Sequence, residues 1–214
     1  MGTVQYRWNA LGQLDTVKVL GGATTVYGYD GVGQRVRKTV NGVTTRYVLH
    51  DGQVALELNA TGGIVAEYTY YAGTDRPHGM RRGGVQYFYV QDAEGNVSGL
   101  LNASGAVVET YTYTPQGELV GGGGGVTNPY RYKGREWDAE AGLYYMRARY
   151  YDPGTSRFLS EDPIGLAGGL NPYVFGEADP VNNMDPTGTS VCEIQLGRQW
   201  TEVRDDGAIV VMSE

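Results

Sequence analysis

Two four-residue segments near the end of the chain carry the residues best placed to do chemistry. They are Asp162-Pro163-Ile164-Gly165 and Asp185-Pro186-Thr187-Gly188, and their aspartates are 23 positions apart. Asp at the first place, Pro at the second and Gly at the fourth are typical of a type I β-turn. Two such turns hold two carboxylates in fixed positions. If the fold brings them together, the carboxylates can share one proton and act as an acid and a base.

A simpler interpretation is that both segments are only turns, because Asp-Pro-x-Gly is common turn chemistry. The other reactive side chains give weaker evidence of a functional site. His50 and His78 are far apart and have no cysteine pair near them, so we expect no metal and no cofactor. The single cysteine, Cys192, has no obvious histidine partner, and we expect it to be a small packed residue.

Composition favours an all-β protein. The 214 residues include 34 glycines and 18 tyrosines but only 3 phenylalanines, which indicates strands and turns with half-wet aromatic surfaces. Seventeen basic against 24 acidic residues give a net charge of −7, which argues against a nucleic-acid partner. The chain shows neither an apolar leader nor a run long enough for a membrane span. It therefore stays inside its cell, leaves by a route without a cleaved signal, or is a piece of a longer chain.

Residues 1 to about 125 are repetitive with a period of 21. Trp8 and Tyr29 are one period apart, as are Asp30 and Asp51. Each unit alternates polar and apolar residues in short runs such as TTVYGY, TTRYVL and VETYTY, separated by turn signals such as Asn41-Gly42. The pattern predicts a β-meander of hairpins in a long curved sheet. Such a sheet has two open edges, which further repeats or a partner must cover.

The sequence changes in character after five glycines in a row, Gly121 to Gly125, which we expect to be a flexible joint. Beyond it, Leu143 to Tyr151 predicts one dense strand, and residues 170–183 predict a short helical turn around Tyr173. The chain therefore divides into a repeat sheet over 1–125, a second region over 126–189 and a short tail over 190–214.

The repeats and the second region resemble a known family. The Tyr-Asp units with glycine, over most of residues 4–120, are similar to YD repeats. The run from YKGREWDAEAGLYYMRARYYDPGTSRFLSEDPIG to NMDPTG, over about 130–188, closely resembles the Rhs repeat-associated core motif.

The resemblance implies a YD-repeat β-meander that forms part of a curved, cocoon-like sheet, closed at one end by a C-terminal plug. In this family the shell encloses a C-terminal toxin, and the core is an intramolecular aspartyl protease that cuts the chain beyond the second DPxG. The implied partners are the chain's own C-terminal segment or a toxin cargo, together with further repeats or a shell partner. The implied location is the bacterial cytoplasm, followed by type VI or toxin-complex delivery without a cleaved signal peptide.

Carried onto this chain, the resemblance makes Asp162 and Asp185 the catalytic aspartates and Arg157 an arginine close to the site. The scissile bond that the resemblance implies is Thr189–Ser190. Two positions depart from the family pattern, Ser156 for the usual glycine and Thr189 for the usual leucine. One aspartate would take a proton from water, the other would donate to the scissile carbonyl, and Arg157 would stabilise the negative charge.

Two other interpretations stay open. The first is a non-catalytic binding module for carbohydrate or protein at a cell surface, because tyrosine-rich strand faces suit such surfaces. The second is a remnant that folds poorly and aggregates through open strand edges. Chain breakage that depends on both aspartates distinguishes the enzyme from either alternative.

Overall fold

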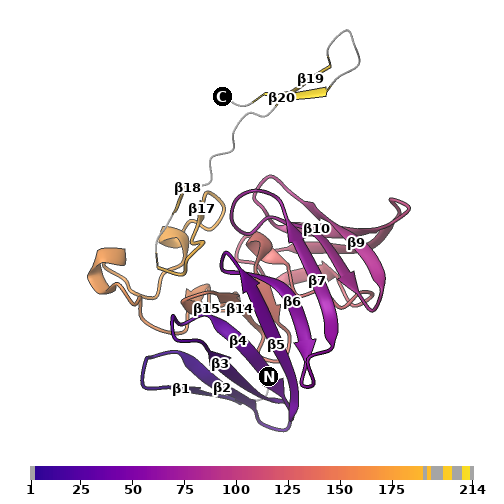
Figure 1. Ribbon diagram of the computed structural model, residues 1–214. Helices are drawn as coiled ribbons and strands as arrows, with labels where there is room; N and C mark the ends of the chain where they lie inside the picture. The colour runs from indigo at the N-terminus through magenta and orange to yellow at the C-terminus, as the bar shows by residue number, and fades with distance from the viewer. Residues whose placement is uncertain (1–2, 190–191, 194–199, 204–208, 213–214) are drawn as a thin grey trace.

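The computed structural model describes residues 3–189, 192–193, 200–203 and 209–212. Twelve strands form one antiparallel sheet in which each strand pairs with the next along the chain, so the predicted meander is confirmed. Figure 1 shows the sheet bending around the segment that carries β14 and β15. The strands are β1 (Val4–Trp8), β2 (Leu14–Val19), β3 (Thr24–Tyr29), β4 (Arg35–Val40), β5 (Val43–His50), β6 (Gln53–Asn59), β7 (Ile64–Tyr70), β8 (Pro77–Arg82), β9 (Val85–Gln91), β10 (Val97–Asn102), β11 (Val107–Tyr113) and β12 (Leu119–Gly122).

One turn design recurs through the sheet. An Asn or Asp side-chain oxygen accepts hydrogen bonds of 2.8–3.0 Å from the backbone N–H groups two and four residues ahead. A short polar side chain thus satisfies amides that the strand ladder leaves free. This explains why the repeat places Asn or Asp where each such strand ends. The turns with this design begin at Asn9, Asp30, Asn59, Asp92 and Asn102.

The glycine run is not the flexible joint that its composition predicts. Residues up to Gly122 belong to β12, and the carboxylate of Glu109 accepts hydrogen bonds from the amides of Gly123, Gly125 and Val126 at 3.0, 2.6 and 2.8 Å. The glycines let the backbone approach its neighbours closely, since a Cβ on Gly122 would lie 1.9 Å from the Thr110 carbonyl oxygen. The run therefore connects the two regions as ordered structure.

A second, four-stranded antiparallel sheet follows. It contains β13 (Glu136–Asp138), β14 (Leu143–Met146), β15 (Arg149–Asp152) and β16 (Arg157–Phe158). The single strand predicted over 143–151 is wrong: the chain reverses at Arg147 and Ala148, where Arg147 has a φ of +53°. The remaining elements are the 3₁₀ turns η1 (Tyr132–Gly134), η2 (Gly165–Gly168) and η3 (Gly176–Ala178), and the strand pairs β17 (Asn183–Met184) with β18 (Cys192–Glu193) and β19 (Trp200–Val203) with β20 (Ile209–Met212). The helical turn predicted around Tyr173 is found a few residues later, at η3.

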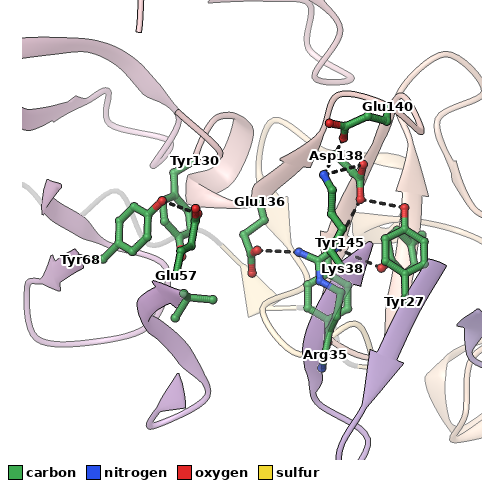
Figure 2. Close-up of polar contacts among 12 residues, drawn as sticks. Tyr27, Arg35, Lys38, Glu57, Tyr68, Tyr130, Glu136, Asp138, Glu140 and Tyr145 are labelled. Atoms are coloured by element: carbon green, nitrogen blue, oxygen red, sulfur yellow. Dashed lines mark hydrogen bonds and ion pairs between the residues drawn. The ribbon is translucent and has the colours of Figure 1, made fainter. Parts of the chain in front are cut away.

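The second region, residues 126–189, shares its hydrophobic core with the long sheet. Tyr130 packs with residues of the middle repeats, while Leu143 and Tyr150 pack with Leu14 and Tyr27 of the first two. Tyrosine hydroxyls carry polar contacts across these layers, such as the 2.7 Å bond from Tyr27 to Asp138 (Figure 2). These tyrosines therefore pack with their rings and bond with their hydroxyls. In the part of the chain that the structure describes, no helix has the length and apolarity needed to cross a membrane.

Candidate active site

The fold brings the two DPxG aspartates to a single cation. The Nη2 atom of Arg149 lies 3.0 Å from Oδ2 of Asp162 and 2.9 Å from Oδ2 of Asp185. Because both oxygens contact one nitrogen, they lie within about 6 Å of each other. All three residues are at least 93% buried. The site is thus a buried pair of carboxylates with a guanidinium between them.

Arg149 is held in place from several directions. It opens β15 directly after the tight turn, and its guanidinium carbon lies 3.6 Å from the ring centroid of Phe158. Its other nitrogens donate to the carbonyl oxygens of Pro172 and Gly188. Burial lowers the pKa of Arg149, while Asp162 and Asp185 act in the opposite direction and favour its charged form.

Each aspartate also organises its own turn. Asp162 Oδ1 accepts from the amide of Ile164 at 3.0 Å, and its carbonyl accepts from Gly165 at 2.9 Å. Asp185 Oδ1 accepts from the amide of Thr189 at 3.0 Å. One oxygen of each carboxylate therefore closes a turn while the other faces Arg149, which fixes the orientation of both groups.

Arginines also hold the backbone of the second DPxG segment. Arg135 and Arg147 both donate to the carbonyl oxygen of Pro186, and Arg149 donates to that of Gly188. Asp75 pairs with Arg135 at 2.7 Å and with Arg147 at 2.9 Å, so it orients both. Burial lowers the pKa of Arg135 to about 10, although Asp75 opposes this effect. The chain is thus fixed immediately before the predicted cleavage point.

Gly188 is the contact point between this segment and the β14–β15 turn. Its φ is +73°, and a Cβ added there would lie 2.2 Å from the carbonyl oxygen of Met146. The carbonyl of the preceding Thr187 accepts a hydrogen bond from the amide of Ala148 at 3.3 Å. The last position of the second DPxG therefore needs glycine for both conformation and space.

The remaining predicted residues are Arg157, Thr189 and Ser190. Arg157 is exposed on β16 and makes no ion pair with any described residue; the arginine contact with the aspartates belongs to Arg149, which the sequence reasoning missed. The signal that could have identified Arg149 is its place within a run of aromatic residues, which indicates burial. A buried arginine needs a carboxylate partner. Thr189 is partly buried beside Asp185, and Ser190 lies outside the described residues. Ser156, where the family has glycine, has a φ of +58°.

A cleft gives solvent access to this region. Its volume is about 790 Å³, and its lining includes Asp162, Thr187, Arg147, Trp8 and Leu159. A water molecule can therefore approach Asp162 from the side of the first repeats. Within the described residues, no group of three His, Cys, Asp or Glu side chains is arranged to hold a metal ion.

Comparison with known proteins identifies the family to which this fold belongs. Residues 1–177 match the family described as Teneurin YD-shell. The chain belongs to the YD-shell family. The tRNA nuclease WapA of Bacillus subtilis (strain 168) is 35% identical over 87% of this YD-shell chain, which spans only 8% of WapA. Toxin protein Tse5 of Pseudomonas aeruginosa is 45% identical over 32% of the chain and 5% of its own length.

A crystal structure of TcdB2-TccC3-TEV superposes on the YD-shell chain with a TM-score of 0.70 and 26% identity. The match covers 86% of this chain and 10% of that one. The predicted Rhs-type, all-β shell fold is therefore confirmed.

Proposed function

We propose that this chain forms part of a bacterial Rhs-type shell that encloses a C-terminal toxin and cuts itself between Thr189 and Ser190. The convergence of Asp162 and Asp185 on Arg149 is the observation that carries the proposal. The relatives support a toxin setting, because they include a tRNA nuclease and a toxin protein. In this proposal the protein is made in the bacterial cytoplasm and leaves by a type VI or toxin-complex route.

The proposed reaction is hydrolysis of one peptide bond, once per chain. Water adds to the carbonyl carbon of Thr189 and gives a proton to the ionised aspartate. The protonated aspartate donates to the carbonyl oxygen, and the collapsing intermediate passes a proton to the departing Ser190 amine. The products are a new carboxylate at Thr189 and a new amino group at Ser190.

Arg149 has a positioning and electrostatic role in this scheme. It holds both carboxylates and compensates part of their charge, so that two buried acids can lie side by side. Arg135 and Arg147 fix the carbonyl of Pro186, which positions the substrate segment. Because the substrate is part of the same chain, this positioning supplies much of the rate.

A comparison of arginine variants tests these assignments. Arg149→Gln should abolish cleavage, whereas Arg157→Gln should leave it unchanged, because Arg157 is exposed and unpaired with either aspartate in the described structure. Cleavage is followed as the fraction of chain shortened at Thr189 by mass spectrometry. Equal cleavage in the parent and Arg149→Gln would contradict the proposed site. A chain that stays whole in every form would favour the non-catalytic binding module instead.

A further inference from the structure

A second cleft, separate from the aspartate site, lies between the long sheet and the second region. Its volume is about 460 Å³, within the range of ligand-binding pockets. Strands β4, β5, β6 and β8 line one side, and residues 124–140 line the other. Figure 2 shows polar side chains of this region, with Glu57 apart from the group formed by Arg35, Lys38 and Glu136.

The cleft gathers buried hydrogen-bond donors that lack acceptors. Within the described residues, the buried side-chain atoms without a hydrogen-bond partner are the Nε atoms of Arg35, Arg82 and Arg131, and all three arginines line this cleft. Arg35 is only 4% exposed. Buried donors are normally satisfied by protein or by water, so these three arginines are the groups of the cleft that an added acceptor would serve.

Three of the four cations that line the cleft have carboxylate partners, and Asp138 is a further partner of Arg35 and Lys38. Arg35 pairs with Glu136 at 2.6 Å, Lys38 with Glu140 at 2.6 Å, and Arg82 with Glu57 at 2.7 Å. Arg131 has no ion pair or side-chain hydrogen bond with a described residue. Its guanidinium instead lies 5.5 Å from the ring of Tyr111 and 5.7 Å from that of Trp137. Arg131 is thus a cation held between aromatic rings, without a carboxylate partner among the described residues.

We propose that this cleft binds an acidic side chain of a second polypeptide, with its carboxylate on Arg131. A carboxylate matches the planar guanidinium, and its single charge suits a wall that already holds three carboxylates. A phosphate carries more charge and meets more repulsion there. The rings of Tyr47 and Trp137 give the flanking peptide an apolar surface. In the toxin-shell setting, on which this last step rests, that polypeptide is the enclosed cargo.

The test uses the full chain carrying Asp162→Asn, so that the binding measurement does not depend on cleavage. The probe is a capped Gly-Glu-Gly peptide, with capped Gly-Gln-Gly and inorganic phosphate as comparisons. Binding is followed through the indole N–H signal of Trp137 by NMR. We expect saturable binding of the glutamate peptide, about tenfold weaker for the glutamine peptide and for phosphate.

Arg131→Gln should weaken binding of the glutamate peptide by about tenfold or more. Arg46→Gln is the matched control, because Arg46 is exposed on β5 between Thr45 and Tyr47, on the opposite face of the strand. Equal binding by both variants, or no change in the Trp137 indole signal with any probe, would overturn the proposal. The cleft would then be one that only water fills. If Arg131→Gln does not fold, the glutamate and glutamine peptides still decide the question in the Asp162→Asn chain.

Discussion

The backbone amide of Thr189 donates a 3.0 Å hydrogen bond to the carboxylate of Asp185. The residue before the proposed cleavage point is therefore held by the acid proposed to act on it. One carboxylate oxygen serves this turn and the other contacts Arg149 at 2.9 Å. Asp185 therefore has a structural role in the turn that is distinct from its proposed acid–base role.

Asp185→Asn and Asp185→Ala should therefore behave differently. The asparagine keeps an oxygen that can accept from Thr189 but cannot exchange a proton as an acid does, so this variant should stay folded and whole. Both variants lose the carboxylate oxygen that pairs with buried Arg149, and the alanine also loses the hydrogen bond from Thr189 that closes the turn, so it should be less stable than the asparagine by about 0.5–1.5 kcal/mol. Chemical denaturation and intact mass measure the two effects. Equal stability of the two variants would contradict the structural part of this role.

Gly188 and Gly165 offer a matched pair for testing how the second DPxG is seated. Both have left-handed φ values, +73° and +62°, so alanine brings strain of about 1–2 kcal/mol at either position. Only Gly188 lacks space for a Cβ, because Met146 blocks it; nothing lies within 4 Å at Gly165. Gly188→Ala should slow cleavage by about a hundredfold or more, as misplacement by about 1 Å does. Gly165→Ala should cleave at a rate much closer to that of the parent, and the same rate for both variants would argue against the proposed seating.

The sequence predicted the repeat sheet well, because its signals are local. Asp30 or Asn59 closes its own turn with amides two and four residues ahead, so a short window of sequence contains the cause. The prediction of a flexible joint at the glycine run was wrong, because the order of this run depends on Glu109, a residue on a neighbouring strand. The residues next to the run in sequence do not predict that contact.

The site was predicted only in part for a similar reason. Resemblance pointed to Asp162 and Asp185, and the structure places them around one nitrogen atom. The arginine was assigned to Arg157 because the resemblance places the family's arginine there. The contact belongs to Arg149 because the β14–β15 reversal turns this residue into the core, and that reversal was not predicted.

Asp138 should be a strong link between the two sheets. It is buried, and it pairs with Lys38 at 3.1 Å and with Arg35 at 3.5 Å. Burial alone would raise the pKa of Asp138, but Lys38 and Arg35 outweigh it and hold that pKa below its ordinary value. Asp138→Asn should cost about 1.5–3 kcal/mol of unfolding free energy at neutral pH, because Arg35 and Lys38 lose a buried partner and keep only Glu136 and Glu140.

Glu140→Gln is the control for that variant, because its side chain is 33% exposed against 1% for Asp138. Its cost should be at most about 1 kcal/mol. The carboxylate of Asp138 contributes stability above its unfolded-state pKa, and this stability is lost as the pH falls through the lower folded-state pKa. The difference between parent and Asp138→Asn should therefore shrink in acid; a constant difference would contradict the charge-based role.

Alkaline pH should unfold this protein steeply. Burial raises the pKa of Tyr89, Tyr130 and Tyr150 well above the ordinary value of 10.0. Above pH 10 the unfolded chain loses these protons while the folded chain keeps them, so stability falls as the pH rises. Each such tyrosine contributes about 1.4 kcal/mol per pH unit in that range. Tyrosinate absorbance should rise together with loss of structure by circular dichroism; ionisation of all tyrosines in a folded chain would contradict this prediction.

The most direct measurement of the proposed self-cleavage is the intact mass of the full chain after purification, beside Asp162→Asn and Asp185→Asn. We predict that the parent separates into residues 1–189 and 190–214, and that both variants keep the mass of the whole chain. A parent chain that stays whole, or a variant that is cut at the same bond, would contradict the assignment of Asp162 and Asp185 as the catalytic pair.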